Sequence, residues 1–363
     1  MPEPRPPPRG EVRKSQDKMI LRGQDSTRAP QWIYPVHNTH NVAACFIAES
    51  PYTPLSCTQT MTHFTRKPSQ ALKGVRILSL SLNLPGPAAL QRLRIMGATC
   101  LKFEPPAPID APTGLSGDPM SAYSRTAYEA LHAGIRTRAV DLKTPAGQHT
   151  LQRQLAKTDV LLTSFRPSAL NKLGLAWKSL HVTHPQLSLI AIVGAPGARA
   201  NEPGHDLTYL AENDLVTGLD LPATLYADMG GALMASEAVL QAVLLQRQTG
   251  YGACFEVALS QAAAHLALPR RWGLTLPGTQ IGGAHAGYRV YPCQDGRVAL
   301  AALEPHFAKS LCSVMGLAWH GPAMMMEADT HQKVAQFIAS CTCETLESLA
   351  KSHDIPLHVL LNK

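Results

Sequence analysis

The sequence predicts an α/β protein with a parallel sheet, followed by a smaller α+β unit. Two observations support this fold class. Between residues 73 and 260, short apolar runs rich in β-branched residues alternate with helical segments, and such alternation implies parallel strands joined by crossover helices. After residue 285 the pattern changes to a strand at 288–291, a turn at Gln294-Asp295-Gly296 and a strand at 297–302.

Proline punctuates the first part of the predicted sheet. The β-rich run 74–82 is broken at residues 85–87, and residues 88–96 then have a helical pattern. A second strand, 97–103, stops at Glu104-Pro105-Pro106. The elements expected next are strand 138–142, helix 147–157, strand 160–163, a helical turn at 170–173 and strand 187–193.

A long helix is expected from Met229 to about Gln248, closed by Thr249-Gly250. A strand at 254–258 and a further helix follow it. We therefore place a large domain at residues 61–260 and a small domain at 261–363. Residues 1–60 lack periodicity and begin with MPEPRPPPRG. We expect a disordered extension, or a start misplaced upstream of Met61, with a regulatory tail as the alternative.

Composition excludes several classes of protein. The longest apolar runs are far shorter than the roughly 18 residues that span a bilayer, and the N-terminus does not resemble a signal peptide. We therefore expect a soluble, cytoplasmic protein without a membrane partner. The net charge is +7, but no nucleic-acid motif accompanies it, and an anionic ligand explains the bias. The eight cysteines are scattered and the close pair Cys341 and Cys343 lacks a partner pair, so we expect free thiols and no metal site.

Basic and acidic side chains mark two candidate ligand segments. Arg166 follows the strand 160–163 and precedes a short helix, where a guanidinium can clamp a phosphate; the alternative is a surface arginine. His205 and Asp206 follow a Pro-Gly turn. Imidazole exchanges protons near neutral pH, although a histidine in a turn is the simpler interpretation.

Two further segments carry carboxylates. Asp228 stands at the start of the long helix beside Gly230 and Gly231. It is expected to be the N-cap, and the backbone N–H groups of 228–230 could hold a developing oxyanion. The glycines would let a ligand approach the backbone. Glu304 ends an apolar strand, where a buried carboxylate is costly unless it is paired or functional.

Together these segments resemble the class III CoA-transferase family (CaiB/BaiF type). Eight blocks from about residue 73 onward match the family in order. They are GVRILSLSLNLPGP, GATCLKFEPP, RAVDLKTPAG, DVLLTSFRPSALNKLGL, PGHDLTY, LYADMGGALMA, RQTGYG and YRVYPCQDGRVALAALEPHF. The resemblance implies a Rossmann-like large domain, a smaller domain and an interlocked homodimer. It also implies coenzyme A as part of an acyl-CoA substrate, with no permanently bound cofactor.

Within that family the site residues resemble those of the α-methylacyl-CoA racemase branch. The resemblance implies that His205 and Asp228 exchange protons with an α-carbon and that Glu304 supports them. It also implies that Arg166, Lys102, Arg136 and Arg138 contact the CoA phosphates. The alternatives are CoA transfer between carboxylic acids, with Asp206 as nucleophile, and an inactive CoA-binding relative.

Two departures from the family pattern bear on these alternatives. His205 and Asp228 are closer in sequence than expected for the racemases, which shortens the loop that shapes the acyl pocket. The sequence ends at DIPLHVLLNK, without the segment by which relatives return to the large domain.

Overall fold

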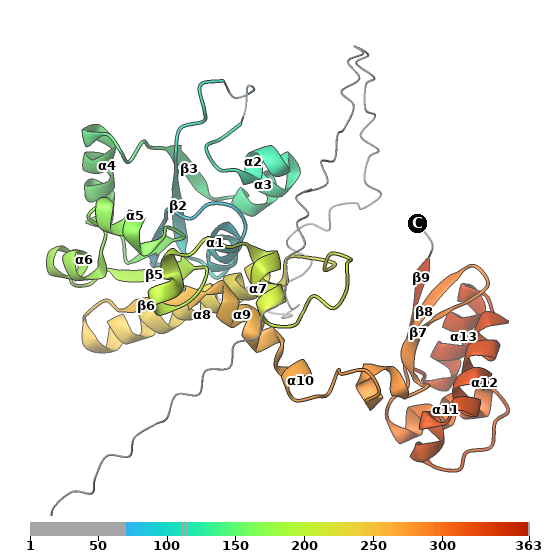
Figure 1. Ribbon diagram of the computed structural model, residues 1–363. Coiled ribbons are helices and arrows are strands. Elements are labelled where there is room, and N and C mark those ends of the chain that lie inside the picture. The colour runs from blue at the N-terminus through green and yellow to red at the C-terminus, as the bar shows by residue number, and fades with distance from the viewer. Residues whose placement is uncertain (1–69, 111, 113–114, 362–363) are drawn as a thin grey trace, which may run out of the picture. The chain divides into compact units, whose positions relative to one another are not determined.

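The large lobe is built on a six-stranded parallel sheet (Figure 1). The structure, a computed structural model, describes residues 70–110, 112 and 115–361; the expected extension 1–60 therefore lies outside the described residues. The strand order is β3-β2-β1-β4-β5-β6 and every pairing is parallel. In that order the strands are β3 (Arg136–Ala139), β2 (Thr99–Glu104), β1 (Arg76–Ser79), β4 (Val160–Thr163), β5 (Ser188–Val193) and β6 (Cys254–Ala258). The predicted α/β class with a parallel sheet is confirmed.

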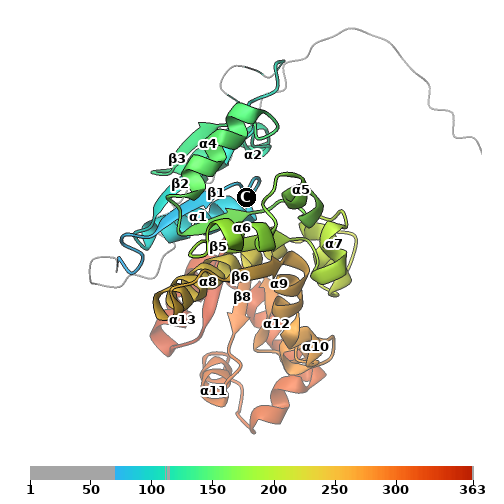
Figure 2. The same cartoon turned by 90° about the vertical axis from the view of Figure 1, so that its left-hand side faces the viewer.

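Helices cover both faces of this sheet (Figures 1 and 2). Neighbouring strand residues belong to opposite cores: Ile77 packs into the core that contains α1 and α8, and Leu78 into the core that contains α4, α5 and α6. Strands buried on both faces need the continuous apolar runs seen in the sequence. The bounds are α1 (Pro85–Ile95), α4 (Pro145–Leu155), α5 (Pro167–Lys172), α6 (Trp177–Thr183), α8 (Tyr226–Thr249) and α9 (Leu259–Leu266).

Helix α8 begins three residues earlier than predicted and ends where predicted. Its last residue is Thr249, and Gly250 adopts the left-handed conformation with φ 77°, which glycine tolerates best. Length and hydropathy alone would also suit a membrane span, and 44% of that apolar window is buried in the structure. Packing against α1, α9, β5 and β6 accounts for the buried apolar residues of α8.

Several short elements of the large lobe were not predicted from the sequence. Helix α3 (Arg125–His132) starts at Ser124, whose hydroxyl accepts a hydrogen bond from the Ala127 N–H at 3.2 Å. Such a cap is a local signal that is easily missed when the helix has few buried apolar residues. The others are α2 (Met120–Tyr123), α6, the 3₁₀ turn η1 (Gly197–Asn201), α7 (Asp206–Glu212) and α10 (Leu268–Arg271).

The small lobe has its own sheet and its own core. The predicted pair β7 (Tyr288–Pro292) and β8 (Gly296–Ala301) is antiparallel, and β9 (Leu357–Leu361) adds a third strand beside β8. Buried residues of β7, β8, three α-helices and a 3₁₀ turn form one hydrophobic cluster, and partly buried residues of β9 pack against it. The remaining elements are η2 (Gln280–Ala284), α11 (Pro305–Val314), η3 (Pro322–Met326), α12 (Ala328–Ala339) and α13 (Cys343–His353).

Candidate functional site

A pocket opens at the carboxyl edge of the parallel sheet. Its walls come from the segments after β1, β4 and β5, from the turn before α7 and from the start of α8. Between β1 and β4 the strand order reverses direction, and ligands of open α/β sheets bind at such a switch point. The volume is about 150 Å³, below the roughly 300–1,000 Å³ that encloses a drug-sized ligand. The pocket therefore suits the reacting end of a larger molecule.

Three of the predicted site residues line this one pocket: Arg166, His205 and Asp228. Arg166 is exposed immediately before α5. His205 is exposed immediately before α7. Its backbone N–H donates to the Thr208 hydroxyl at 3.1 Å, and this hydrogen bond fixes the backbone of the turn. Asp228 is the third residue of α8 and half-buried. Segments distant in sequence thus place a cation, an imidazole and a carboxyl group around one space.

Asp206 is next to His205 in sequence but does not line the pocket. Its side chain is buried, and its Oδ1 accepts a hydrogen bond from the Asp228 N–H at 2.9 Å. A carboxylate at this place compensates an unpaired N–H in the first turn of α8. Asp206 therefore ties α7 to the start of α8 and positions Asp228.

The same arrangement perturbs the acidity of Asp228. Burial, followed by the negative charge of Asp206, raises the pKa of Asp228 from its ordinary 3.8 to about 7. Both effects disfavour the ionised form. A carboxyl group with a pKa near neutrality can both donate and accept a proton under physiological conditions.

Asp228 should also make the stability of the protein depend on pH. Between about pH 4 and pH 7 the folded chain holds a proton that the unfolded chain has lost, because the pKa is raised to about 7 in the fold. The free energy of unfolding must therefore fall as pH rises through this range. The contribution is at most about 4 kcal/mol, since each unit of pKa difference is worth about 1.4 kcal/mol.

Urea denaturation of the wild type and of Asp228→Asn at pH 4.5 and 7.5 checks this prediction. The variant should lose much of the decrease in unfolding free energy between the two pH values. An equal decrease in both proteins would contradict the assignment of the raised pKa to Asp228.

The backbone at the start of α8 corrects two expectations. The N-cap is Leu225, not Asp228. The Asp228 N–H is taken by Asp206, and the Met229 N–H donates to the Leu225 carbonyl at 3.0 Å. These two N–H groups are satisfied within the fold, so neither is free to hold an oxyanion.

The glycines of α8 serve helix packing. A Cβ on Gly231 would lie 2.2 Å from Cδ2 of Leu259, and one on Gly230 would lie 3.3 Å from Cβ of Ala262. Both neighbours belong to α9. Close contact between α8 and α9 therefore explains glycine at these positions, and the ligand approach at Gly230 and Gly231 stays a prediction.

Lys102 is paired inside the fold, and its burial argues against the predicted contact with a CoA phosphate. Its side chain is fully buried, with Nζ 3.0 Å from Glu104 Oε1, 2.8 Å from His132 Nε2 and in a short ion pair with Asp118. His132 Nδ1 lies 2.6 Å from the Tyr128 carbonyl, and burial followed by the Lys102 charge lowers the pKa of His132. The neutral ring accepts from the ammonium. A phosphate would have to displace buried carboxylates, so we leave Lys102 out of the proposed site.

Arg136, Arg138 and Glu304 also lie outside the pocket lining. Arg136 begins β3 and lines a second hollow with Arg76 and Lys157, at the amino edge of the sheet. Arg138 is exposed on the same edge strand. Glu304 belongs to the small lobe and is exposed before α11. Because the Glu304 carboxylate is exposed, it carries no free-energy cost of burial, contrary to the expectation from the sequence.

Most residues that line the pocket were not predicted from the sequence, and two of them, Asn83 and Tyr209, have clear structural roles. Asn83, after β1, has φ 63°, and its N–H donates to Asp118 Oδ1 at 3.0 Å. Asparagine tolerates this conformation better than most residues, so the Asn-Leu-Pro sequence was an available signal. Tyr209 is buried in the pocket wall; a Cβ on Gly194 or Gly204 would lie 2.3 or 2.6 Å from its hydroxyl oxygen. Glycine at both positions makes room for the phenol.

Known proteins with similar sequences include both transferases and a racemase. A family model described as CoA-transferase family III matches residues 72–362. The succinyl-CoA–D-citramalate CoA-transferase of Chloroflexus aurantiacus is 26% identical over 330 residues, covering 80% of this chain and 79% of the relative. The α-methylacyl-CoA racemase of Homo sapiens is 27% identical over 265 residues, covering 68% of this chain and 65% of the relative.

A crystal structure has a similar fold. The hypothetical protein Rv3272 from Mycobacterium tuberculosis superimposes with a TM-score of 0.66 at 22% identity, covering 81% of this chain and 86% of that one. At this identity the likeness concerns the fold alone.

Proposed function

Because the chain belongs to CoA-transferase family III, whose members here include CoA-transferases and an acyl-CoA racemase, we propose that it epimerises the α-carbon of a 2-methyl (α-branched) acyl-CoA. The observation that carries this proposal is the shared pocket of His205 and Asp228. Asp206, the nucleophile that transfer would need, is buried behind them and hydrogen-bonded to the Asp228 backbone.

The reaction uses one base and one acid on opposite sides of the α-carbon. A thioester makes the α C–H acidic, because the enolate places its charge on oxygen. For one enantiomer His205 takes the α-proton while protonated Asp228 delivers another proton to the opposite face. For the other enantiomer Asp228 is the base and His205 the acid. The pKa of about 7 lets Asp228 take either role near neutral pH.

Deuterium exchange tests this reaction directly. The protein is incubated in deuterium oxide with (2R)- or (2S)-2-methylacyl-CoA and no second carboxylate. We expect solvent deuterium at the α-carbon of both enantiomers together with loss of optical purity. Binding of the acyl-CoA without exchange or inversion would reject the proposal and favour a non-catalytic CoA-binding protein.

Arg166 is proposed to bind a CoA phosphate at the rim of the pocket. A charge-assisted hydrogen bond of this kind is worth about 1.5–3 kcal/mol. Arg166→Gln should therefore raise KM for acyl-CoA about 10- to 100-fold with kcat little changed, because binding is lost equally from substrate and transition state.

Arg136→Gln is the matched control for this measurement, because Arg136 lines the hollow at the other edge of the sheet. Steady-state kinetics of both variants decide between the two arginines. A larger increase of KM for Arg136→Gln would transfer the phosphate role to that arginine.

CoA transfer is the second candidate, favoured by the coverage of the Chloroflexus transferase, which extends over 80% of this chain. Asp206 would attack the thioester carbonyl to form a mixed anhydride and release the CoA thiolate. The thiolate would then attack the aspartyl carbonyl, which releases the acyl group as a carboxylate and leaves an aspartyl-CoA thioester. Borohydride or hydroxylamine should trap that thioester on Asp206, and Asp206→Ala should abolish transfer while His205→Ala is tolerated. For Asp206 to react, its carboxylate must leave the Asp228 N–H.

We further propose that the protein is a cytoplasmic homodimer. We also propose that it has no nucleic-acid or membrane partner and no permanently bound cofactor.

A further inference from the structure

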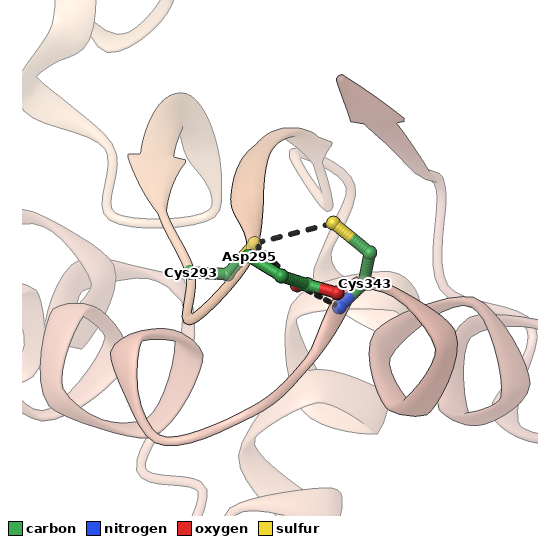
Figure 3. Close-up of side chains that lie close together, drawn as sticks. All are labelled: Cys293, Asp295 and Cys343. Carbon is green, nitrogen blue, oxygen red and sulfur yellow. Dashed lines mark hydrogen bonds between the residues drawn. The ribbon is translucent and has the colours of Figure 1, made fainter. Parts of the chain in front are cut away.

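Two thiols and a carboxylate meet in the small lobe (Figure 3). Cys293 follows β7, Asp295 lies in the turn before β8, and Cys343 is the first residue of α13. The two Sγ atoms are 3.4 Å apart. One ligand atom from each residue lies within 4.8 Å of the others. In the sequence, Cys343 lacks nearby cysteine ligands beyond Cys341. The fold brings Cys293 and Asp295, which lie between β7 and β8, to Cys343. We propose that Cys293, Asp295 and Cys343 bind a zinc ion.

The spacing of the ligand atoms matches a tetrahedral metal better than a disulfide. Two sulfurs on one zinc lie about 3.8 Å apart, and a sulfur and a carboxylate oxygen about 3.5 Å, when the bonds are about 2.3 and 2.0 Å. The observed distances are 3.4 Å between the sulfurs and 3.8 Å from Cys293 Sγ to Asp295 Oδ1. A disulfide would need the sulfurs about 2.05 Å apart.

Backbone contacts hold the two ligand-bearing segments together. Asp295 Oδ1 accepts a hydrogen bond from the Cys343 N–H at 2.7 Å. The Gln294 N–H donates to the Cys341 carbonyl at 3.0 Å, and its amide donates to the Ser340 carbonyl at 2.9 Å. Such contacts orient ligands before an ion binds. A water molecule can complete four-coordination.

Binding exchanges protons for the ion. Burial, followed by Cys293 and Asp295, raises the pKa of Cys343 to about 12, whereas the hydrogen bond from the Cys343 N–H lowers the pKa of Asp295. Zinc binding forms two Zn–S bonds and one Zn–O bond, and each thiol that becomes a ligand releases its proton to solvent. Affinity must accordingly rise with pH.

Zinc content of the full chain tests the site. Cys45 and Cys57, which lie outside the described residues, are changed to Ser in every protein so that they contribute no ligand. After one equivalent of zinc and dialysis, we expect about one zinc per chain by mass spectrometry. Cys293→Ser with Cys343→Ser should retain none above background, and Cys254→Ser, which removes an exposed thiol of the large lobe, should retain all of it.

Two further measurements keep the test independent of folding defects. Asp295→Asn preserves both thiols and should lower zinc affinity at least about tenfold. Cobalt added to the protein with Cys293 and Cys343 intact should give thiolate-to-cobalt charge-transfer absorption. No retained zinc, equal retention by the double serine variant, or a loss of two hydrogens in mass without metal, which indicates a disulfide, would each overturn the proposal.

The site does not depend on the proposed function. Its ligands all belong to the small lobe, and zinc retention is measured without substrate. Failure of the exchange reaction and failure of zinc binding are therefore separate results.

Discussion

His205→Gln is expected to lower the rate of epimerisation about 100- to 10,000-fold, the usual contribution of a positioned acid or base. Its effect on isotope exchange should differ between enantiomers. The enantiomer that His205 deprotonates should stop exchanging its α-proton. The other should still exchange through Asp228, which lines the same pocket, without inverting.

Asp228→Asn should give the mirror image of this result. The enantiomer that still exchanges in His205→Gln should stop exchanging, and the other should continue. Proton nuclear magnetic resonance of each pure enantiomer in deuterium oxide measures both quantities. His149→Gln, on the exposed surface of α4, is the control and should behave as wild type. Equal loss of exchange from both enantiomers in both variants would argue against two bases.

Lys102→Met is expected to destabilise the fold by about 3–5 kcal/mol, the usual effect of removing one partner of a buried ion pair. The ammonium of Lys102 is fully buried between Asp118 and Glu104, and the change would leave two buried carboxylates without their cation. Methionine keeps most of the side-chain volume, so the loss reports on charge and not on a cavity.

An exposed pair in the same chain is the matched control for Lys102. Lys333 and Asp329 form an ion pair at 2.6 Å with side chains 47% and 68% exposed, and Lys333→Met should cost at most about 1 kcal/mol. Urea denaturation of both variants gives the comparison. Similar losses would show that the buried pair contributes no more than the exposed one.

Partial recovery of stability in Lys102→Met with Asp118→Asn would show that the unpaired Asp118 carboxylate causes part of the loss. An asparagine oxygen can still accept from the Asn83 N–H, as Asp118 does at 3.0 Å. Asn83 lines the pocket, so Asp118 connects the buried ion pair with the pocket wall.

The regular elements followed from local patterns because their signals lie within a few residues. The predicted strand 160–163 coincides with β4, and the predicted strand 254–258 coincides with β6. Thr249-Gly250 marks the end of α8. The short α3 and the third strand β9 escaped prediction. The N-terminus of α3 is set by the side-chain cap of Ser124. Strand β9 forms by pairing with β8, which is distant in sequence.

Local patterns in the sequence were enough for the fold class and the parallel sheet, and the family resemblance pointed to Arg166, His205 and Asp228, which line one pocket. The surroundings of the ionisable groups depend on tertiary contacts. The tertiary structure buried Lys102 among carboxylates, turned Asp206 toward the Asp228 backbone and brought Cys293 to Cys343. Burial and pairing arise from contacts between distant segments, and no local pattern records those contacts.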